Sequence, residues 1–294
     1  MFYIVVCALS LAAFSGCARQ GSPQEVVITA APTAAAPAAT PTPAFMASAS
    51  PGVPDEPSPA PSPALSPAAS PTPAATKKPK QPLSGLIIGV DPGHQAHADR
   101  EQEPVAPGSS ATKNKVSSGT RGVKTGVYEY EVNLAVGLLL RDMLEEAGAT
   151  VVITHTEADV NISNIERARF FNDNKVNLGV RLHCNGSEDK SVRGAFMLVP
   201  KSKDYPYYDD CVLAAKAILK AYGEATGIDV KKGITYRSDQ TGFNWCDRPV
   251  TNIEMGHMTN PDEDLLLTDE AFQVKMARGI FNGIVAYFEA KDRG

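Results

Sequence analysis

From about residue 84 onward, apolar residues alternate between short continuous runs and stripes with helical spacing. The run 86–90 (LIIGV) is short and apolar, as expected for a buried parallel strand. Residues 129–147 instead place apolar side chains three to four positions apart, and Gly148 follows as a helix stop signal. The pattern therefore predicts a buried strand followed by an amphipathic helix.

The same alternation continues toward the C-terminus. The spacing predicts further strands at 150–154, 178–182, 195–199 and 250–254, and further helices at about 163–174, 209–226 and 271–289. Alternating strands and helices are typical of an α/β fold, here a single domain over residues 84–294 with a mainly parallel central sheet flanked by helices. There is no internal repeat, and a domain of this length can bury one sizeable core.

The residues before this domain have a different composition. Of the 23 prolines, 16 lie at or before Pro82, among many Ala, Ser and Thr residues and few large apolar ones. Such a segment cannot bury a core and favours extended polyproline II conformations. We therefore expect a disordered Pro/Ala-rich linker over residues 17–83.

The first 16 residues are mostly apolar and end in small residues before Cys17. The run is shorter than the roughly 20 apolar residues that span a bilayer, and it is typical of a secretory signal peptide. The ending FSGC (14–17) resembles a bacterial lipobox, which implies export and lipidation of Cys17. Ordinary signal cleavage nearby and an uncleaved anchor are the alternatives.

Charge and cysteine content exclude several classes of protein. The net charge of −5 leaves no excess of Lys and Arg for general nucleic-acid binding. Apart from Cys7 and Cys17, the cysteines are Cys184, Cys211 and Cys246, an odd number without a CxxC pair. A disulfide framework or a Cys-based zinc site is therefore not expected, and these three residues should be small buried side chains.

Candidate chemistry lies where the predicted strands end. His94 follows the first strand, His183 and Glu254 end two later strands, and Glu129 opens the first helix. The carboxyl ends of parallel strands meet at one edge of a sheet, which is where ligands bind in such folds. Two imidazoles and one carboxylate form a ligand set used by hydrolytic zinc sites, and a further carboxylate could move the proton of the attacking water.

Four spaced motifs resemble those of the zinc-dependent N-acetylmuramoyl-L-alanine amidases of the amidase-3 type: VDPGH at 90–94, EYEVNL at 129–134, RLHCNG at 181–186 and IEMGHMTNPDEDLLL at 253–267. The resemblance implies Zn²⁺ held by His94, Glu129 and His183, with Glu254 as the catalytic general base. The implied reaction is hydrolysis of the amide bond between N-acetylmuramic acid and L-alanine in peptidoglycan. The implied setting is the bacterial cell wall. Together with the lipobox-like ending, this predicts an exported domain that is lipid-anchored to the membrane facing the wall.

Two other functions stay open at this stage: a zinc peptidase that cuts within the stem peptide, and a non-catalytic module that binds peptidoglycan. The residues that bind substrate and the oligomeric state are not predicted.

Several further residues carry weaker expectations. We expect His257 at the surface, with a position lining the pocket, where it would alter substrate preference, as the alternative. We expect Cys184 as a filler turned away from the metal and no ligand role for His97, while His155 has no assigned role. The stretch between His94 and Glu129 is expected to be a structureless loop beside the substrate groove. Its basic residues either meet substrate carboxylates or are solvated, namely Lys113, Lys115, Arg121 and Lys124. Trp245 could wall the groove or pack in the core.

Overall fold

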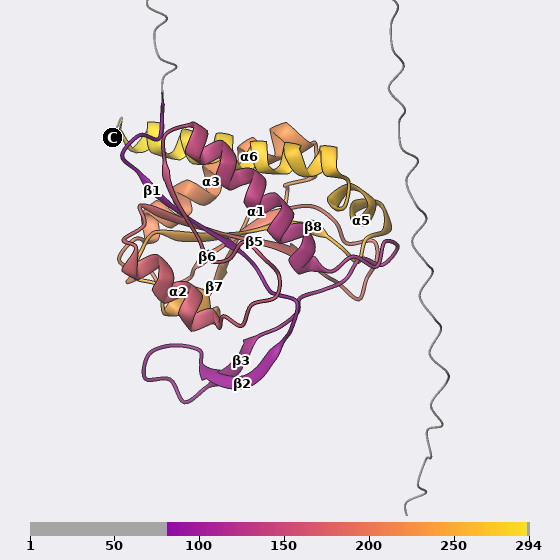
Figure 1. The fold of residues 1–294 in the computed structure, drawn as a ribbon, viewed down its shortest axis with the longest axis horizontal. Helices are drawn as coiled ribbons and strands as arrows, with labels where there is room; N and C mark the ends of the chain where they lie inside the picture. Colours follow the sequence, from indigo (N-terminus) through magenta and orange to yellow (C-terminus); the bar gives the residue numbers. More distant parts are fainter. Residues whose placement is uncertain (1–80, 293–294) are drawn as a thin grey trace, which may run out of the picture. The chain divides into compact units, whose positions relative to one another are not determined.

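Six strands form the central sheet of the computed structural model, which describes residues 81–292 (Figure 1). The strands are β1 (Ile87–Pro92), β4 (Thr150–Ile153), β5 (Leu178–Asn185), β6 (Phe196–Pro200), β7 (Ile234–Arg237) and β8 (Val250–His257). Their order across the sheet is β4–β1–β5–β8–β6–β7. All neighbouring pairs are parallel except β6 and β8, so β6 and β7 run opposite to the other four strands. The expectation of an α/β fold with a mainly parallel sheet is confirmed.

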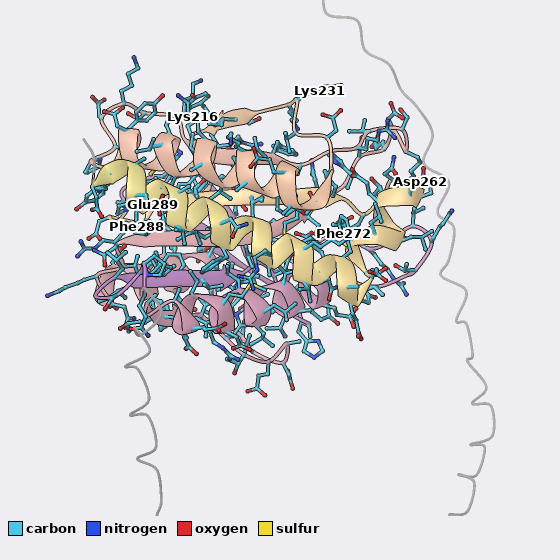
Figure 2. The ribbon with its side chains drawn as sticks, turned by 90° about the horizontal axis from the view of Figure 1, so that it is seen from above. Lys216, Lys231, Asp262, Phe272, Phe288 and Glu289 are labelled. Carbon is cyan, nitrogen blue, oxygen red and sulfur yellow. The ribbon has the colours of Figure 1, made fainter. Side chains whose placement is uncertain are left out.

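Helices cover both faces of this sheet. One face carries α1 (Glu129–Glu146), α3 (Tyr208–Thr226) and α6 (Glu270–Lys291), and Figure 2 shows α6 lying between the other two. The opposite face carries α2 (Asn164–Asp173) and the short α4 (Thr241–Asn244), while α5 (Pro261–Leu267) follows β8. Apolar side chains of α1, α3 and α6 form one core with those of the sheet, which keeps the strand ends in fixed positions.

The apolar core is divided by the sheet into a larger and a smaller cluster. The larger one joins α1, α3 and α6 to the sheet through side chains such as Leu140, Ile218 and Ile280. The smaller one lies under α2 and α4 and includes Phe171 and Phe243. Leu83 is fully buried in the larger cluster, so packing begins one residue before the expected domain start.

A β-hairpin replaces the loop that was expected between His94 and Glu129. Strands β2 (Asp99–Pro104) and β3 (Thr112–Val116) pair antiparallel and stand apart from the main sheet (Figure 1). The expectation of a structureless stretch was wrong because these strands are rich in charged residues and lack the apolar alternation of a half-buried strand. The hairpin is fixed to the body by the Trp245 indole N–H, which donates to the Pro104 carbonyl at 2.9 Å.

Two further expectations can be compared with the described residues. Cys184, Cys211 and Cys246 are buried and form no disulfide, as expected. Within residues 81–292, no helix has the length and apolar character needed to cross a membrane. The predicted signal peptide (1–16), the lipidation of Cys17 and the linker up to residue 80 lie outside the described residues.

Candidate metal centre and active site

Three donor atoms converge at the carboxyl edge of the sheet. His94 lies two residues beyond β1, His183 lies near the end of β5, and Glu129 is the first residue of α1. His94 Nε2 is 3.0 Å from Glu129 Oε1, His183 Nδ1 is 3.1 Å from the same oxygen, and the two nitrogens are 3.1 Å apart. Among the described residues, these three form the group of His and acidic side chains able to hold a metal ion.

The backbone at His94 has a rare conformation, and hydrogen bonds hold both this backbone and the imidazole ring in place. His94 has a φ of 68°, in the left-handed region that non-glycine residues rarely adopt. Arg167 donates to the His94 carbonyl at 3.0 Å, which fixes the backbone in this conformation. The His94 Nδ1–H donates to the Ser117 carbonyl at 2.8 Å, so the Nε2 lone pair faces Glu129 and His183.

Backbone donors orient the Glu129 carboxylate. Oε2 accepts from the Thr120 amide at 2.8 Å, and Oε1 accepts from the Cys184 amide at 3.1 Å. Burial works to raise the pKa of this carboxyl, but the two histidines outweigh it, so the pKa of Glu129 lies below its usual range. The carboxylate at the start of α1 is also favoured by the helix dipole. Glu129 is therefore held as an anion facing both imidazoles.

A glycine makes room for His183. A Cβ atom built on Gly93 would lie 2.2 Å from His183 Cε1, closer than non-bonded atoms approach. Burial lowers the pKa of His183 to about 4, so the imidazole is neutral at pH 7. A neutral imidazole with a free lone pair is the form that binds a metal.

Glu254 stands beside the three donors on the neighbouring strand. In the β5–β8 pairing His183 is aligned with Glu254, and Glu254 is 9% exposed. Its pKa is raised to about 8, chiefly by burial and also by the Glu129 carboxylate. The Asn252 amide donates to Glu254 Oε1 at 3.3 Å. A buried carboxyl with a pKa near neutrality is suited to taking up and releasing a proton.

These side chains line one polar cavity of about 510 Å³. Its other walls come from the hairpin exit, the end of β5, the start of α4 and β8, namely Gly119, Thr120, Cys184, Asn185, Gly186, Gln240 and Asn252. Sequence reasoning missed Asn252, although it is two residues before Glu254 and so shares its face of the strand. Gln240 carried no such signal, because it precedes a four-residue helix that the pattern does not reveal.

A buried ion-pair network lies beneath the centre and was not predicted. Asp91 is fully buried and accepts from Arg167 at 2.7 Å and from Arg181 at 2.8 Å. Burial opposes ionisation, yet the two guanidinium groups hold the pKa of Asp91 well below its usual range. His155 is buried at 7% exposure beside this network, and its pKa is lowered to about 4 by burial and by Arg167. The network ties α2 to β1 and β5, the two strands that lead to His94 and His183.

The expectation that His257 lies at the surface was wrong. Its side chain is 1% exposed, because β8 continues three residues past Glu254 into the interior. His257 Nδ1 lies 3.1 Å from the Gly194 carbonyl, and Nε2 lies 3.1 Å from the Asn185 amide nitrogen. Since Asn185 lines the cavity, His257 helps to hold a wall of the site.

The remaining expected residues lie around this cavity. The Cys184 thiol points to Asn133 Oδ1 at 3.7 Å, as expected of a side chain turned away from the metal donors. His97 is exposed and pairs with Asp159 at 3.8 Å. Of the basic residues in the hairpin region, Lys113 meets Asp239, Lys115 meets Glu101, and Arg121 stacks over Tyr128.

Known proteins are similar to this chain in sequence and in fold. The pattern of the Amidase_3 family, described as N-acetylmuramoyl-L-alanine amidase, matches residues 88–286. A germination-specific N-acetylmuramoyl-L-alanine amidase of Bacillus subtilis is 28% identical over 229 residues, covering 71% of this chain and 83% of the relative. An N-acetylmuramoyl-L-alanine amidase of Mycobacterium tuberculosis is 26% identical over 212 residues, covering 70% of this chain and 87% of the relative.

A solved structure extends the likeness to three dimensions. The N-acetylmuramyl-L-alanine amidase of Mycobacterium smegmatis is 26% identical, with a TM-score of 0.65, covering 71% of this chain and 99% of that one. The matched region takes in the whole sheet, the three converging donors and the buried carboxyl beside them. This chain is therefore an enzyme of the Amidase_3 family, the N-acetylmuramoyl-L-alanine amidases of cell-wall peptidoglycan.

Proposed function

We propose that this amidase binds one zinc ion through His94, Glu129 and His183 and uses Glu254 as its general base. The bond cleaved is the amide between N-acetylmuramic acid and L-alanine in peptidoglycan. The observation that carries the proposal is the convergence of three donor atoms to 3.0–3.1 Å beside a buried carboxyl.

The donor set suits zinc. Two imidazole nitrogens and one carboxylate oxygen form a known zinc ligand set that leaves the fourth position for water or substrate. Ligand atoms of a tetrahedral zinc with bonds near 2.0–2.1 Å are about 3.3 Å apart, close to the separations here. The bond from His94 Nδ1–H to the Ser117 carbonyl orients a ligand ring in the way metal-bound histidines usually require.

Each residue then has a defined task. Bound zinc supplies positive charge that polarises the scissile carbonyl and lowers the pKa of the attacking water. Glu254 takes the proton of that water and delivers it to the departing alanine nitrogen. Asn252 donates to one oxygen of Glu254, and both residues line the polar cavity that would admit the amide.

Digestion of a defined muropeptide tests the proposal. Purified enzyme should release a peptide that begins with L-alanine, identified by mass spectrometry. A chelator should abolish release, and added zinc should restore it. The variant Glu254→Gln should retain zinc and lose about 10²- to 10⁴-fold in rate. Cuts within the stem peptide would replace the proposal with a zinc peptidase, and binding without turnover would replace it with a wall-binding module.

We also propose that the chain is exported and anchored by a lipid on Cys17, with residues 17–83 as a spacer. The lipobox-like ending of the apolar run and the Pro/Ala-rich composition support this. Since the substrate lies outside the cell membrane, an exported and tethered enzyme would reach it directly.

A further inference from the structure

A lysine ammonium lies within electrostatic reach of the Glu254 carboxyl, at the start of β7, whereas the metal donors come from β1, β5 and α1. In the antiparallel β6–β8 pairing Phe196 is aligned with Glu254, so the two side chains share one face of the sheet. Lys232 Nζ lies over the Phe196 ring, 3.3 Å from its centroid. This cation–π contact holds the ammonium over the residue that is paired with Glu254 across the two strands.

Lys232 forms no short ion pair among residues 81–292. Its neighbours are paired: Lys231 lies 3.7 Å from Asp229, and Arg237 meets Asp239 at 2.7 Å. No carboxylate of the described residues lies within 4.0 Å of Lys232 Nζ. Burial lowers the pKa of Lys232, and the charge of Glu254 opposes that shift, which places the two groups in electrostatic reach.

The direction of the substrate follows from the sheet order. Metal donors come from the ends of β1 and β5 and from α1, whereas Lys232 precedes β7 at the far side of β8. If Glu254 protonates the departing nitrogen, the group attached to that nitrogen extends past Glu254 toward β6 and β7. In the proposed reaction this group is the peptide, which is the part of the polymer that carries carboxylates.

We propose that Lys232 binds the first carboxylate of the departing stem peptide and so determines which peptides the enzyme prefers. This inference rests on the proposed function, because it uses the role of Glu254 to orient the substrate. An extended peptide advances about 3.3 Å per residue, so a carboxylate on the second residue lies several ångströms beyond the scissile nitrogen. Lys232 lies in that direction, and its ammonium forms no ion pair within 4.0 Å with a carboxylate of the described residues.

Two substrates that differ in one group test the inference. Both are muropeptides, identical except that the second residue carries either a free carboxylate or the neutral carboxamide. The wild-type enzyme is expected to prefer the carboxylate by about tenfold in kcat/KM, mainly through KM, as for one charge-assisted hydrogen bond. Lys232→Met should bring that ratio close to one, and Lys232→Glu should reverse it.

Lys231→Met is the matched control. Its side chain is 91% exposed and lies at the turn before β7, labelled in Figure 2, so this variant should keep the wild-type ratio. A purely structural effect of Lys232→Met would lower kcat/KM equally for the carboxylate and the carboxamide substrate. The ratio of the two kcat/KM values would then stay at the wild-type value, which would overturn the inference. Equal cleavage of both substrates by the wild-type enzyme would also overturn it while leaving the proposed function intact. If the zinc-loaded wild type cleaved neither substrate, the proposed function and this inference would fail together.

Discussion

Glu254 combines two properties that oppose each other within one residue. In the protein without a bound cation, burial raises the pKa of Glu254 to about 8, so its carboxyl is protonated at pH 7. A general base must instead be ionised. Positive charge at the three donors would favour the ionised form. The proposed use of Glu254 as a proton acceptor would therefore come at the expense of the stability of the metal-free form.

The variant Glu254→Gln should make the metal-free protein more stable at high pH. The unfolded carboxyl ionises near pH 4.5, whereas the folded one keeps its proton to about pH 8. Stability of the wild type thus falls between these pH values, and the full penalty persists above pH 8. With chelator present, the variant should melt several degrees higher at pH 9 and no higher at pH 4. The exposed Glu224→Gln is the control, and a pH-independent gain would contradict the pKa assignment.

Gly93 has a different role, which is to leave space. The variant Gly93→Ala should displace the His183 ring, because the added Cβ would stand 2.2 Å from Cε1. We expect zinc affinity to fall about 10- to 100-fold, as for other changes beside a metal ligand, measured by competition with a chromophoric chelator. Gly223→Ala adds the same methyl group in α3, remote from the donors, and should leave the affinity unchanged. Equal affinity of both variants would show that the ring has room to move.

At the scale of elements, the metal donors depend on how β1, α2 and β5 are tied together. Asp91 of β1 bonds Arg167 of α2 and Arg181 of β5, and Arg167 also donates to the Pro92 carbonyl at 2.9 Å. The strand end that leads to His94 is thus held from two sides. Removing one partner would leave buried charge uncompensated.

Asp91→Asn should therefore lower the free energy of unfolding by about 3–5 kcal/mol. The lowered pKa of Asp91 also predicts how this difference in stability changes with pH. The stability that Asp91 contributes is fully present above its unfolded pKa of about 3.8 and is lost as pH falls below it. The gap between wild type and variant in denaturant titrations should narrow from pH 5 to pH 2.5. Asp142→Asn, at an exposed pair with Arg141, should change stability by less than about 0.5 kcal/mol.

At the scale of the whole molecule, a catalytic domain follows a long segment of different composition. The Pro/Ala-rich stretch contains most of the prolines of the chain, and the core of the described part of the chain is built from Leu83 onward. The proposed lipid on Cys17 would then keep the enzyme at the membrane surface near its polymer.

Cys17→Ala should shift the protein from the membrane fraction to the soluble fraction of expressing cells, because the lipid chains that supply the affinity would be missing. Immunoblots of the two fractions measure the shift. Cys7→Ala is the matched control: this residue lies inside the apolar run, and its loss should leave the distribution unchanged. Membrane retention of the Cys17 variant would contradict the lipid anchor.

Much of this architecture could be predicted because it depends on local pattern. The period of apolar residues gave the positions of α1, α3 and α6 to within a residue or two. The expected ends of strands brought His94, His183 and Glu254 to one edge, because parallel strands share that edge.

Only the tertiary structure decided the parts that depend on contacts between distant residues. The polar strands of the β2–β3 hairpin lack an apolar pattern, and the hairpin is held to the body by Trp245, which is 141 positions away from Pro104 in the sequence. The burial of His257 follows from the length of β8, and Lys232 comes beside Glu254 only because β6 and β7 join the sheet next to β8. The sequence by itself thus determined five of the six strands of the central sheet, the four longest helices, the family and the four residues of the proposed chemistry. Strand order and long-range packing decided what surrounds them, because those choices depend on which distant surfaces bury each other.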